Sequence, residues 1–101
     1  MSGAVYVGTR PTMLDTLIDR QGNPLDVSGF TTMDCKVKKG SGTVFNVGGA
    51  LVSGGVDGKV RATWPEADVT EGSDYVYYWD MLLPSGPFKS DPIHQPVIEL
   101  F

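Results

Sequence analysis

Ser73-Asp-Tyr-Val-Tyr-Tyr-Trp-Asp-Met-Leu-Leu83 is the stretch that decides the fold of this chain. Aromatic and β-branched side chains dominate it, and neither glycine nor proline interrupts it, so it is predicted to be a central strand. Successive side chains of a strand point to opposite faces of its sheet. The predicted core face carries Tyr75, Tyr77, Trp79, Met81 and Leu83, and the opposite face carries Val76, Tyr78, Asp80 and Leu82.

The segments that precede this stretch have the pattern of shorter strands. Residues 31–38 alternate most cleanly between apolar and polar side chains, as a half-buried antiparallel strand does. Their predicted inward residues are Met33, Cys35 and Val37. Asp57-Gly58 is a hairpin signal, and a further strand is predicted after it. The inward residues of that strand are predicted to be Val60, Ala62 and Trp64.

The two ends of the chain are less regular. Residues 12–19 are strand-like, and we expect Leu17 to face the core while the orientation of Leu14 stays open. Residues 1–10 are expected to form either an edge strand or an N-terminal arm that packs on a partner. Residues 97–101 are predicted to be the last strand.

Glycine and proline place turns between these segments. The 101 residues include 13 glycines and 7 prolines, which is typical of an all-β sandwich or small barrel with about seven short antiparallel strands. Residues 19–24 and 84–87 are predicted turns, and Pro65 is expected to open one helical turn. The chain is long enough for one core, so residues 1–101 are predicted to form a single domain.

Charge and cysteine content exclude several classes of protein. The net charge of −4 argues against a nucleic-acid partner and against docking on an anionic membrane. The basic run Lys36, Lys38 and Lys39 is interpreted as an exposed strand face. The first residues lack a basic region followed by an apolar one, so we expect no signal peptide. No apolar run reaches the roughly 18 residues of a membrane span. We therefore expect a protein that is made and kept in a cytosol-like compartment.

The residues that could carry catalysis do not form a recognisable pattern. His94 is predicted to lie in a surface loop between Pro92 and Pro96, and Cys35 is predicted to be a small buried hydrophobic residue. Trp64 and Trp79 fall on inward faces, which favours core packing over a platform for sugars. The chain is predicted to be no enzyme.

Cofactor and metal motifs are also missing. The glycines in residues 48–55 lack the spacing of a phosphate-binding loop and are interpreted as turn and bulge residues. A cluster of carboxylates is interpreted as solvated, with a weak structural calcium site as the alternative. Its members are Glu66, Asp68, Glu71 and Asp74. We predict no cofactor and no catalytic or metal-binding residues.

Several short motifs, in their order and spacing, resemble a known family. These are Leu-Ile-Asp-Arg-Gln-Gly-Asn-Pro-Leu-Asp-Val-Ser-Gly at residues 17–29, Asp-Gly-Lys-Val-Arg-Ala-Thr-Trp at 57–64, the 68–75 step into the central strand, and Pro84-Ser-Gly86 with Asp91-Pro92. Over residues 10–101 the chain resembles the immunoglobulin-like domain of tailed-phage tail and baseplate proteins. That domain is found at the N-terminus of baseplate upper proteins and as small free-standing tail proteins. The chain departs from the family pattern at residues 72–75, where the step is one residue longer.

The resemblance implies an immunoglobulin-like β-sandwich that serves as a virion structural protein of the tail, baseplate or neck. Such a building block would assemble in the host bacterial cytoplasm, through contacts with other phage structural proteins and with further copies of itself. The alternative function is a binding or decoration module, directed at a host-surface carbohydrate or at the phage head. A glycan array and particle imaging would separate these two functions.

The apolar second face of the central strand is the predicted protein interface. Exposed apolar surface of this kind marks contact with a partner. The predicted interface residues are Val76, Tyr78 and Leu82, joined by Phe101, Val5 and Val7. The alternative is that another segment of the same chain covers Val76, Tyr78 and Leu82, since central strands of sandwiches are often apolar on both sides.

Overall fold

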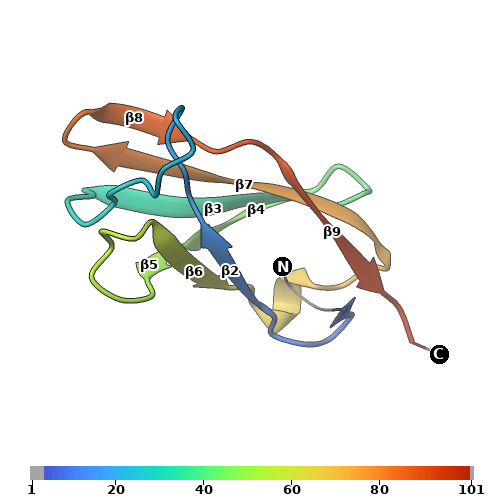
Figure 1. The fold of residues 1–101 in the computed structure, drawn as a ribbon. Helices are drawn as coiled ribbons and strands as arrows, with labels where there is room; N and C mark the ends of the chain where they lie inside the picture. The colour runs from blue at the N-terminus through green and yellow to red at the C-terminus, as the bar shows by residue number, and fades with distance from the viewer. Residues whose placement is uncertain (1–3, 101) are drawn as a thin grey trace.

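A computed structural model describes residues 4–100 and folds them into two β-sheets (Figure 1). The larger sheet contains, in spatial order, β1 (Val5–Tyr6), β9 (Ile93–Ile98), β7 (Ser73–Leu83), β3 (Thr32–Lys38) and β4 (Val44–Gly48). In the same sheet β8 (Gly86–Lys89) pairs with residues 80–83 of β7. The smaller sheet contains β2 (Thr12–Thr16), β6 (Lys59–Thr63) and β5 (Ala50–Leu51). The predicted all-β class is confirmed, and the two sheets are consistent with a β-sandwich.

Strand β7 lies in the middle of the larger sheet and pairs with β3, β8 and β9. Its predicted core face is confirmed, because all five side chains of that face are at most 6% exposed. The predicted inward residues of β3 and of the 59–64 segment are also buried. The alternation of side chains along these strands is therefore sufficient to place most of the core.

Four aromatic rings form the centre of the core between the two sheets. Trp64, which is fully buried, stacks on Tyr75 at a centroid distance of 5.7 Å and meets Tyr77 edge-on at 5.5 Å. Phe45 of β4 approaches the Trp64 ring edge-on from 5.7 Å. Offset and edge-to-face pairs of this kind add about 0.5–1.5 kcal/mol each beyond the area that they bury.

Strand β1 corrects the expectation of wholly antiparallel strands. It runs parallel to β9, with Val5 opposite Val97 and Tyr6 opposite Ile98. After β1 the chain crosses to the smaller sheet, and the Val7 amide donates to the Ile98 carbonyl at 3.0 Å. Val5 is only 5% exposed and belongs to the core, so it is removed from the predicted interface.

Strand β9 corrects the prediction for His94. The strand begins at Ile93 and ends at Ile98, so His94 lies in the sheet opposite Val76 and not in a loop. A proline is tolerated where its missing N–H is not required by a ladder partner. Strand β1 reaches β9 only at Val97 and Ile98, which leaves Pro96 at an open part of the edge.

The alternation of side chains along β3 also corrects the interpretation of the basic run Lys36, Lys38 and Lys39. Lys39 follows β3 in phase with the inward residues Cys35 and Val37, and it is only 8% exposed. Its Nζ donates to Thr70 Oγ1 at 2.7 Å and lies 5.9 Å from the centre of the Phe45 ring. Lys36 and Lys38 therefore remain on the exposed side of β3, whereas Lys39 is part of the interior.

The turn before β6 depends on a glycine. Gly58 has a φ of 74°, and a Cβ at this position would clash with the Leu17 carbonyl oxygen and lie 3.0 Å from that of Leu25. Gly42 has a similar φ of 97°, but a Cβ there would meet no atom within 4 Å. The two glycines share the cost of a positive φ and differ in steric space.

We expect Gly58→Ala to lower the free energy of unfolding by about 2 kcal/mol more than Gly42→Ala, because only the first substitution adds a backbone clash to the strain at positive φ. Urea denaturation of the two variants and the parent measures this difference. Equal losses in the two variants would show that residues 17–25 move aside without penalty.

Candidate interaction surface

The solvent side of the larger sheet is called here the outer face, and β7 supplies its central row. Val76 lies between Lys38 and His94, and Tyr78 lies beside Lys36. Further along β7, Asp80 lies between Asp34 of β3 and Lys89 of β8. Leu82 lies in the same way between Thr32 and Pro87. Apolar and charged side chains are therefore mixed across the centre of this face.

Asp80 is the electrostatic centre of the outer face. Its Oδ2 accepts a hydrogen bond from Lys89 Nζ at 2.9 Å and lies 3.8 Å from Lys36 Nζ. Asp34 stands directly opposite Asp80 in the register, and two carboxylates in that position repel one another. The two lysines compensate this repulsion, so the charges of the central rows are largely neutralised within the sheet.

Tyr78 lies beside this ion network. Lys89 Nζ is 5.8 Å from the centre of the Tyr78 ring, within the range of a cation–π contact. The hydrogen bond to Asp80 raises the pKa of Lys89, and the nearby Asp80 charge adds to the effect. Lys89 is therefore held as a cation beside the ring, and the aliphatic part of its side chain can shield one side of the ring.

A hydrogen-bonded polar pair, His94 and Asp74, flanks Val76 on the outer face. His94 Nδ1 and Asp74 Oδ2 are 2.6 Å apart, and both side chains are exposed. Asp74 also stands opposite Pro96 in the register of β7 and β9. The pair closes the β9 side of the face around Val76, while Lys38 borders Val76 on the other side.

The predicted interface residues occupy three different environments. Val76 and Tyr78 are half-buried among neighbouring side chains of the same sheet, and Leu82 is 42% exposed. Val7 is half-buried and packs against the core at the crossing between the sheets. Phe101 lies outside the described residues. The structure therefore brings Val76, Tyr78 and Leu82 together on one face and leaves Val5 and Val7 away from it.

Sequence reasoning missed three exposed apolar residues of the larger sheet. Tyr6 and Ile98 are register partners at the β1 edge, and both point outward with about 40% of their surface exposed. Val44 lies at the opposite edge, in β4, and is 70% exposed. The alternation in residues 44–48 and 93–98 could have identified Val44 and Ile98, whereas Tyr6 depends on a parallel pairing that no short motif signals.

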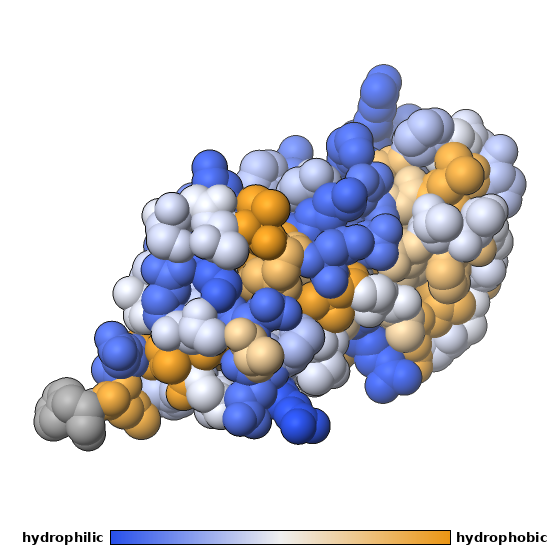
Figure 2. Space-filling view, turned by 180° about the vertical axis from the view of Figure 1, so that it is seen from behind, coloured by the Kyte–Doolittle hydropathy of each residue, from blue (hydrophilic) through white to orange (hydrophobic). Residues whose placement is uncertain are grey.

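Figure 2 shows the molecule from behind and so presents the outer face of the larger sheet. Apolar side chains form several separate patches on this face, with hydrophilic side chains between them. A face of this composition resembles an interface in which small apolar contacts are set within a polar frame.

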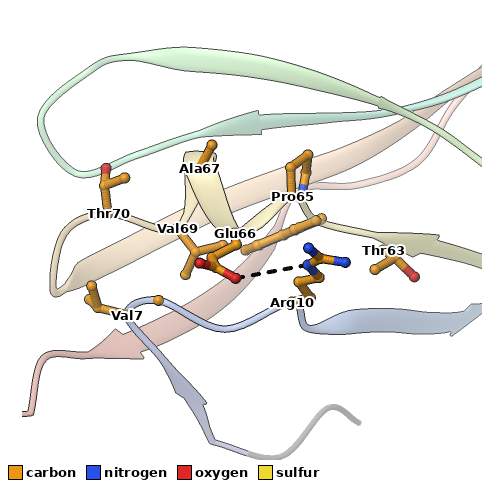
Figure 3. A pocket seen from close by; sticks show the side chains of 10 residues that line it. Val7, Arg10, Thr63, Pro65, Glu66, Ala67, Val69 and Thr70 are labelled. Carbon is orange, nitrogen blue, oxygen red and sulfur yellow. Dashed lines mark ion pairs between the residues drawn. The ribbon is translucent and has the colours of Figure 1, made fainter.

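Two open grooves lie elsewhere on the surface. One, of about 760 Å³, lies between the 7–10 crossing and the 3-10 turn η1 (Glu66–Asp68), and an Arg10–Glu66 ion pair of 3.9 Å spans it (Figure 3). The other, of about 730 Å³, lies between the end of β2 and the β8–β9 segment, and it is lined in part by Phe88 and Ile93. Neither groove contains a charged side chain that is fully buried, so neither has the character of a closed ligand site.

The residues that could carry chemistry are dispersed. Among residues 4–100 no group of three or more His, Cys, Asp or Glu side chains could hold a metal ion. Glu66 pairs with Arg10, Glu71 accepts from Ser41 Oγ at 2.6 Å, and Asp74 pairs with His94. The predicted carboxylate cluster therefore does not converge on one point.

Cys35 and His94 lie on opposite sides of the larger sheet. Cys35 is fully buried, and burial raises the pKa of its thiol from 9.0 to about 12. A thiol with so high a pKa carries almost no thiolate near neutral pH and is a poor nucleophile.

Within the described part of the chain, no helix is both long and apolar enough to cross a membrane.

No family model, no curated protein and no solved structure matches the chain.

Proposed function

We propose that the chain is a bacteriophage virion structural protein, an immunoglobulin-like building block of the tail, baseplate or neck that assembles through protein–protein contacts. The outer face carries this proposal, because it displays Tyr78 and Leu82 between neutralised charges. Surfaces of that kind are used for contact with other proteins. The phage setting rests on the resemblance of the sequence motifs.

The strand order supports the immunoglobulin-like part of the proposal. Immunoglobulin-like sandwiches place the second, fifth and fourth strands in one sheet and the third, sixth and seventh in the other, with an extra strand beside the third in variable-type domains. Here β2, β6 and β5 form one sheet, and β9, β7, β3 and β4 form the other. Ser90 joins β8 to β9 along β7, because its amide donates to the Trp79 carbonyl at 2.9 Å. Strands β8 and β9 thus act together as one last strand.

Carbohydrate adhesion has less support as a function than assembly through protein–protein contacts. Sugar-binding proteins use exposed aromatic rings as stacking platforms. Trp64 and Trp79 are both 0% exposed, and Tyr75 and Tyr77 are buried with them. The exposed Tyr6 and the half-buried Tyr78 lie on different strands and are separated by β9.

Labelling of purified particles tests the proposed location. An antibody against the folded domain, applied to virions of a phage that encodes this chain, is expected to mark the tail, baseplate or neck. Labelling of the head would instead support the decoration function. Absence of the chain from salt-washed particles would overturn the structural role.

The variant Tyr78→Asp is expected to block assembly while the monomer stays folded. It places a carboxylate beside Asp80 on the outer face and removes the ring that Lys89 covers. Incorporation into particles, measured by complementation of a phage that lacks the gene, is expected to fall at least about tenfold, as for loss of a central contact.

Leu14→Asp is the matched control for Tyr78→Asp. Leu14 is 55% exposed on the smaller sheet, so this variant adds the same charge away from the outer face. Circular dichroism checks that both variants are folded. Equal incorporation of both variants would show that the outer face is not the contact surface, and an unfolded Tyr78→Asp monomer would assign Tyr78 to the core.

A further inference from the structure

Strand β4 is a free edge of the larger sheet. It pairs with β3 on one side, and no described strand pairs with its other side. The Lys39 amide donates to the Thr43 carbonyl, and the Gly49 amide donates to that of Met33, so the odd-numbered residues of β4 are bonded to β3. The backbone groups of Val44, Asn46 and Gly48 must then point to the open side.

This edge lacks the features that usually prevent strands from joining. Proteins protect exposed edges with lysine, proline, bulges or very short strands. Strand β4 is five residues long and reads Val-Phe-Asn-Val-Gly. At the other end of the larger sheet, β1 is only two residues long. Strand β8 also has one side without a described partner strand, but it contains Pro87 and Lys89. Among the described strands of this sheet, β4 therefore has the edge that is best suited to pairing with a further strand.

We propose that two copies of the chain associate through their β4 edges, antiparallel, with Asn46 on the twofold axis. In this register Val44 pairs with Gly48 of the second copy, and each pair exchanges backbone hydrogen bonds. The two larger sheets then form one continuous sheet. Such a dimer would be one of the contacts of the proposed structural protein, and it rests on the proposed function only for its place in the particle.

The side chains of β4 are complementary to themselves in this register. Val44, which is 70% exposed, would lie beside Gly48 of the second copy, where no side chain competes for space. On the inner side, Phe45 would lie opposite Val47 of the second copy. Both Phe45 and Val47 are half-buried and pack on the core, so the pairing extends the core across the axis.

The charges next to β4 are also complementary under the same twofold axis. Lys38 is the register partner of Val44 in β3, and Asp34 is the partner of Gly48. The pairing of Val44 with Gly48 of the second copy thus places Lys38 and the second copy's Asp34 in one row. Three strand spacings of about 4.8 Å would separate their backbones, so the long Lys38 side chain would have to extend over Val44 and the glycine to approach the carboxylate. Opposite charges in one row favour this register over slipped ones, and salt screening keeps the effect small.

The free edge of β2 does not offer the same fit to a second copy. It lies beside the groove whose opposite wall is the β8–β9 segment. The β8–β9 segment therefore restricts the approach of a second whole domain to β2. This makes β4 the more accessible edge for a twofold pairing.

Disulfide trapping tests the register directly. Residues that exchange backbone hydrogen bonds across antiparallel strands have Cα atoms about 5.5 Å apart, which suits a disulfide. Asn46→Cys is expected to give a covalent dimer under mild oxidation, at least about tenfold more than Leu14→Cys, which places a thiol at the β2 edge. Cys35 is buried and does not compete. Equal cross-linking of the two variants overturns the proposal.

Sedimentation of the unmodified chain supplies the second measurement. A dimer that appears as concentration rises is expected, and Asn46→Pro should weaken it at least about tenfold, because proline removes the central N–H of the edge. Proline is tolerated at such an edge position, and circular dichroism checks that the variant is folded. A parent chain that stays monomeric, or a variant that dimerises equally well, overturns the proposal.

The two proposals fail in distinguishable ways. Particles that carry the chain, together with Asn46→Cys that does not cross-link, would retain the virion role and reject the β4 dimer. A dimer that cross-links through Asn46→Cys, together with particles that lack the chain, would retain the dimer and reject the virion role.

Discussion

Replacing Asp15 with alanine is expected to lower the free energy of unfolding by about 3 kcal/mol or more. Asp15 lies in β2, and its Oδ2 accepts hydrogen bonds from Tyr77 Oη and Trp79 Nε1 of β7, both at 2.9 Å. Tyr77 and Trp79 are at most 2% exposed. The substitution leaves two buried donors without their acceptor and removes the polar link between the two sheets.

The variant Asp15→Asn separates the contribution of hydrogen bonding to stability from the contribution of charge. Its side-chain oxygen can still accept from both donors, so we expect it to retain most of the stability, with a loss of about 1 kcal/mol. Urea denaturation of Asp15→Ala and Asp15→Asn measures the two losses. If Asp15→Ala is as stable as the parent, water must replace the carboxylate from the adjacent groove, which Asp15 lines.

The two tryptophans provide a matched control for the same link. Trp79 Nε1 donates to the Asp15 carboxylate, whereas the buried Trp64 Nε1 has no oxygen or nitrogen acceptor and only the weakly accepting sulfur of Cys35 nearby. Trp79→Phe is therefore expected to destabilise by about 1–2 kcal/mol more than Trp64→Phe, although both lose the same ring. In the Asp15→Ala background this difference should disappear, as a double-mutant cycle would show.

Side-chain alternation predicts the core of this protein because the burial of a strand residue depends on the face of the sheet to which its side chain points. Each inward residue of β3, β6 and β7 is apolar, and a shift of one residue would expose the whole set. The same reasoning fails at Asp15, which points inward in phase with Met13 and Leu17 although it is charged. Its partners come from 62 and 64 residues further along the chain, so no local pattern can reveal them.

The residues of the candidate surface are harder to predict from the sequence for a similar reason. Val76, Tyr78 and Leu82 follow from the alternation of β7 alone, and the structure does place them on one face. The sequence pattern also places Val5 on that surface, because residues 1–10 are expected to form an edge strand or an arm that packs on a partner. Its parallel pairing with Val97 joins opposite ends of the chain and buries it. Long-range pairings decide which terminal residues are exposed, and short motifs do not encode them.

Stability is expected to fall steeply above about pH 9 because two buried acids keep their protons in the folded state. Burial is the main reason that the pKa of Cys35 rises from 9.0 to about 12. Burial also raises the pKa of Tyr77 above its ordinary value of 10.0, and the Asp15 charge adds to this rise. In the unfolded chain both groups ionise near their ordinary values, so rising pH stabilises the unfolded state selectively.

The direction of the change in stability and the pH range in which it occurs follow from the difference between the pKa values in the folded and unfolded states. Below about pH 9 both groups are protonated in both states and contribute no pH dependence. Above about pH 9 for Cys35 and about pH 10 for Tyr77, the unfolded chain loses a proton that the folded chain keeps, and each unit of pH then removes about 1.4 kcal/mol per group. Cys35 alone then accounts for a loss on the order of 3 kcal/mol between pH 8 and 11.

Cys35→Ala tests the contribution of the thiol. The variant is expected to be less stable than the parent at pH 8, because it leaves a small cavity, yet to lose less stability as the pH rises. Urea denaturation from pH 8 to 11 gives the two profiles, which should converge. Parallel profiles would show that the Cys35 thiol ionises equally easily in both states. Because Tyr77 remains in the variant, a residual alkaline loss that begins near pH 10 is expected from its phenol, and it should be absent in Cys35→Ala/Tyr77→Phe.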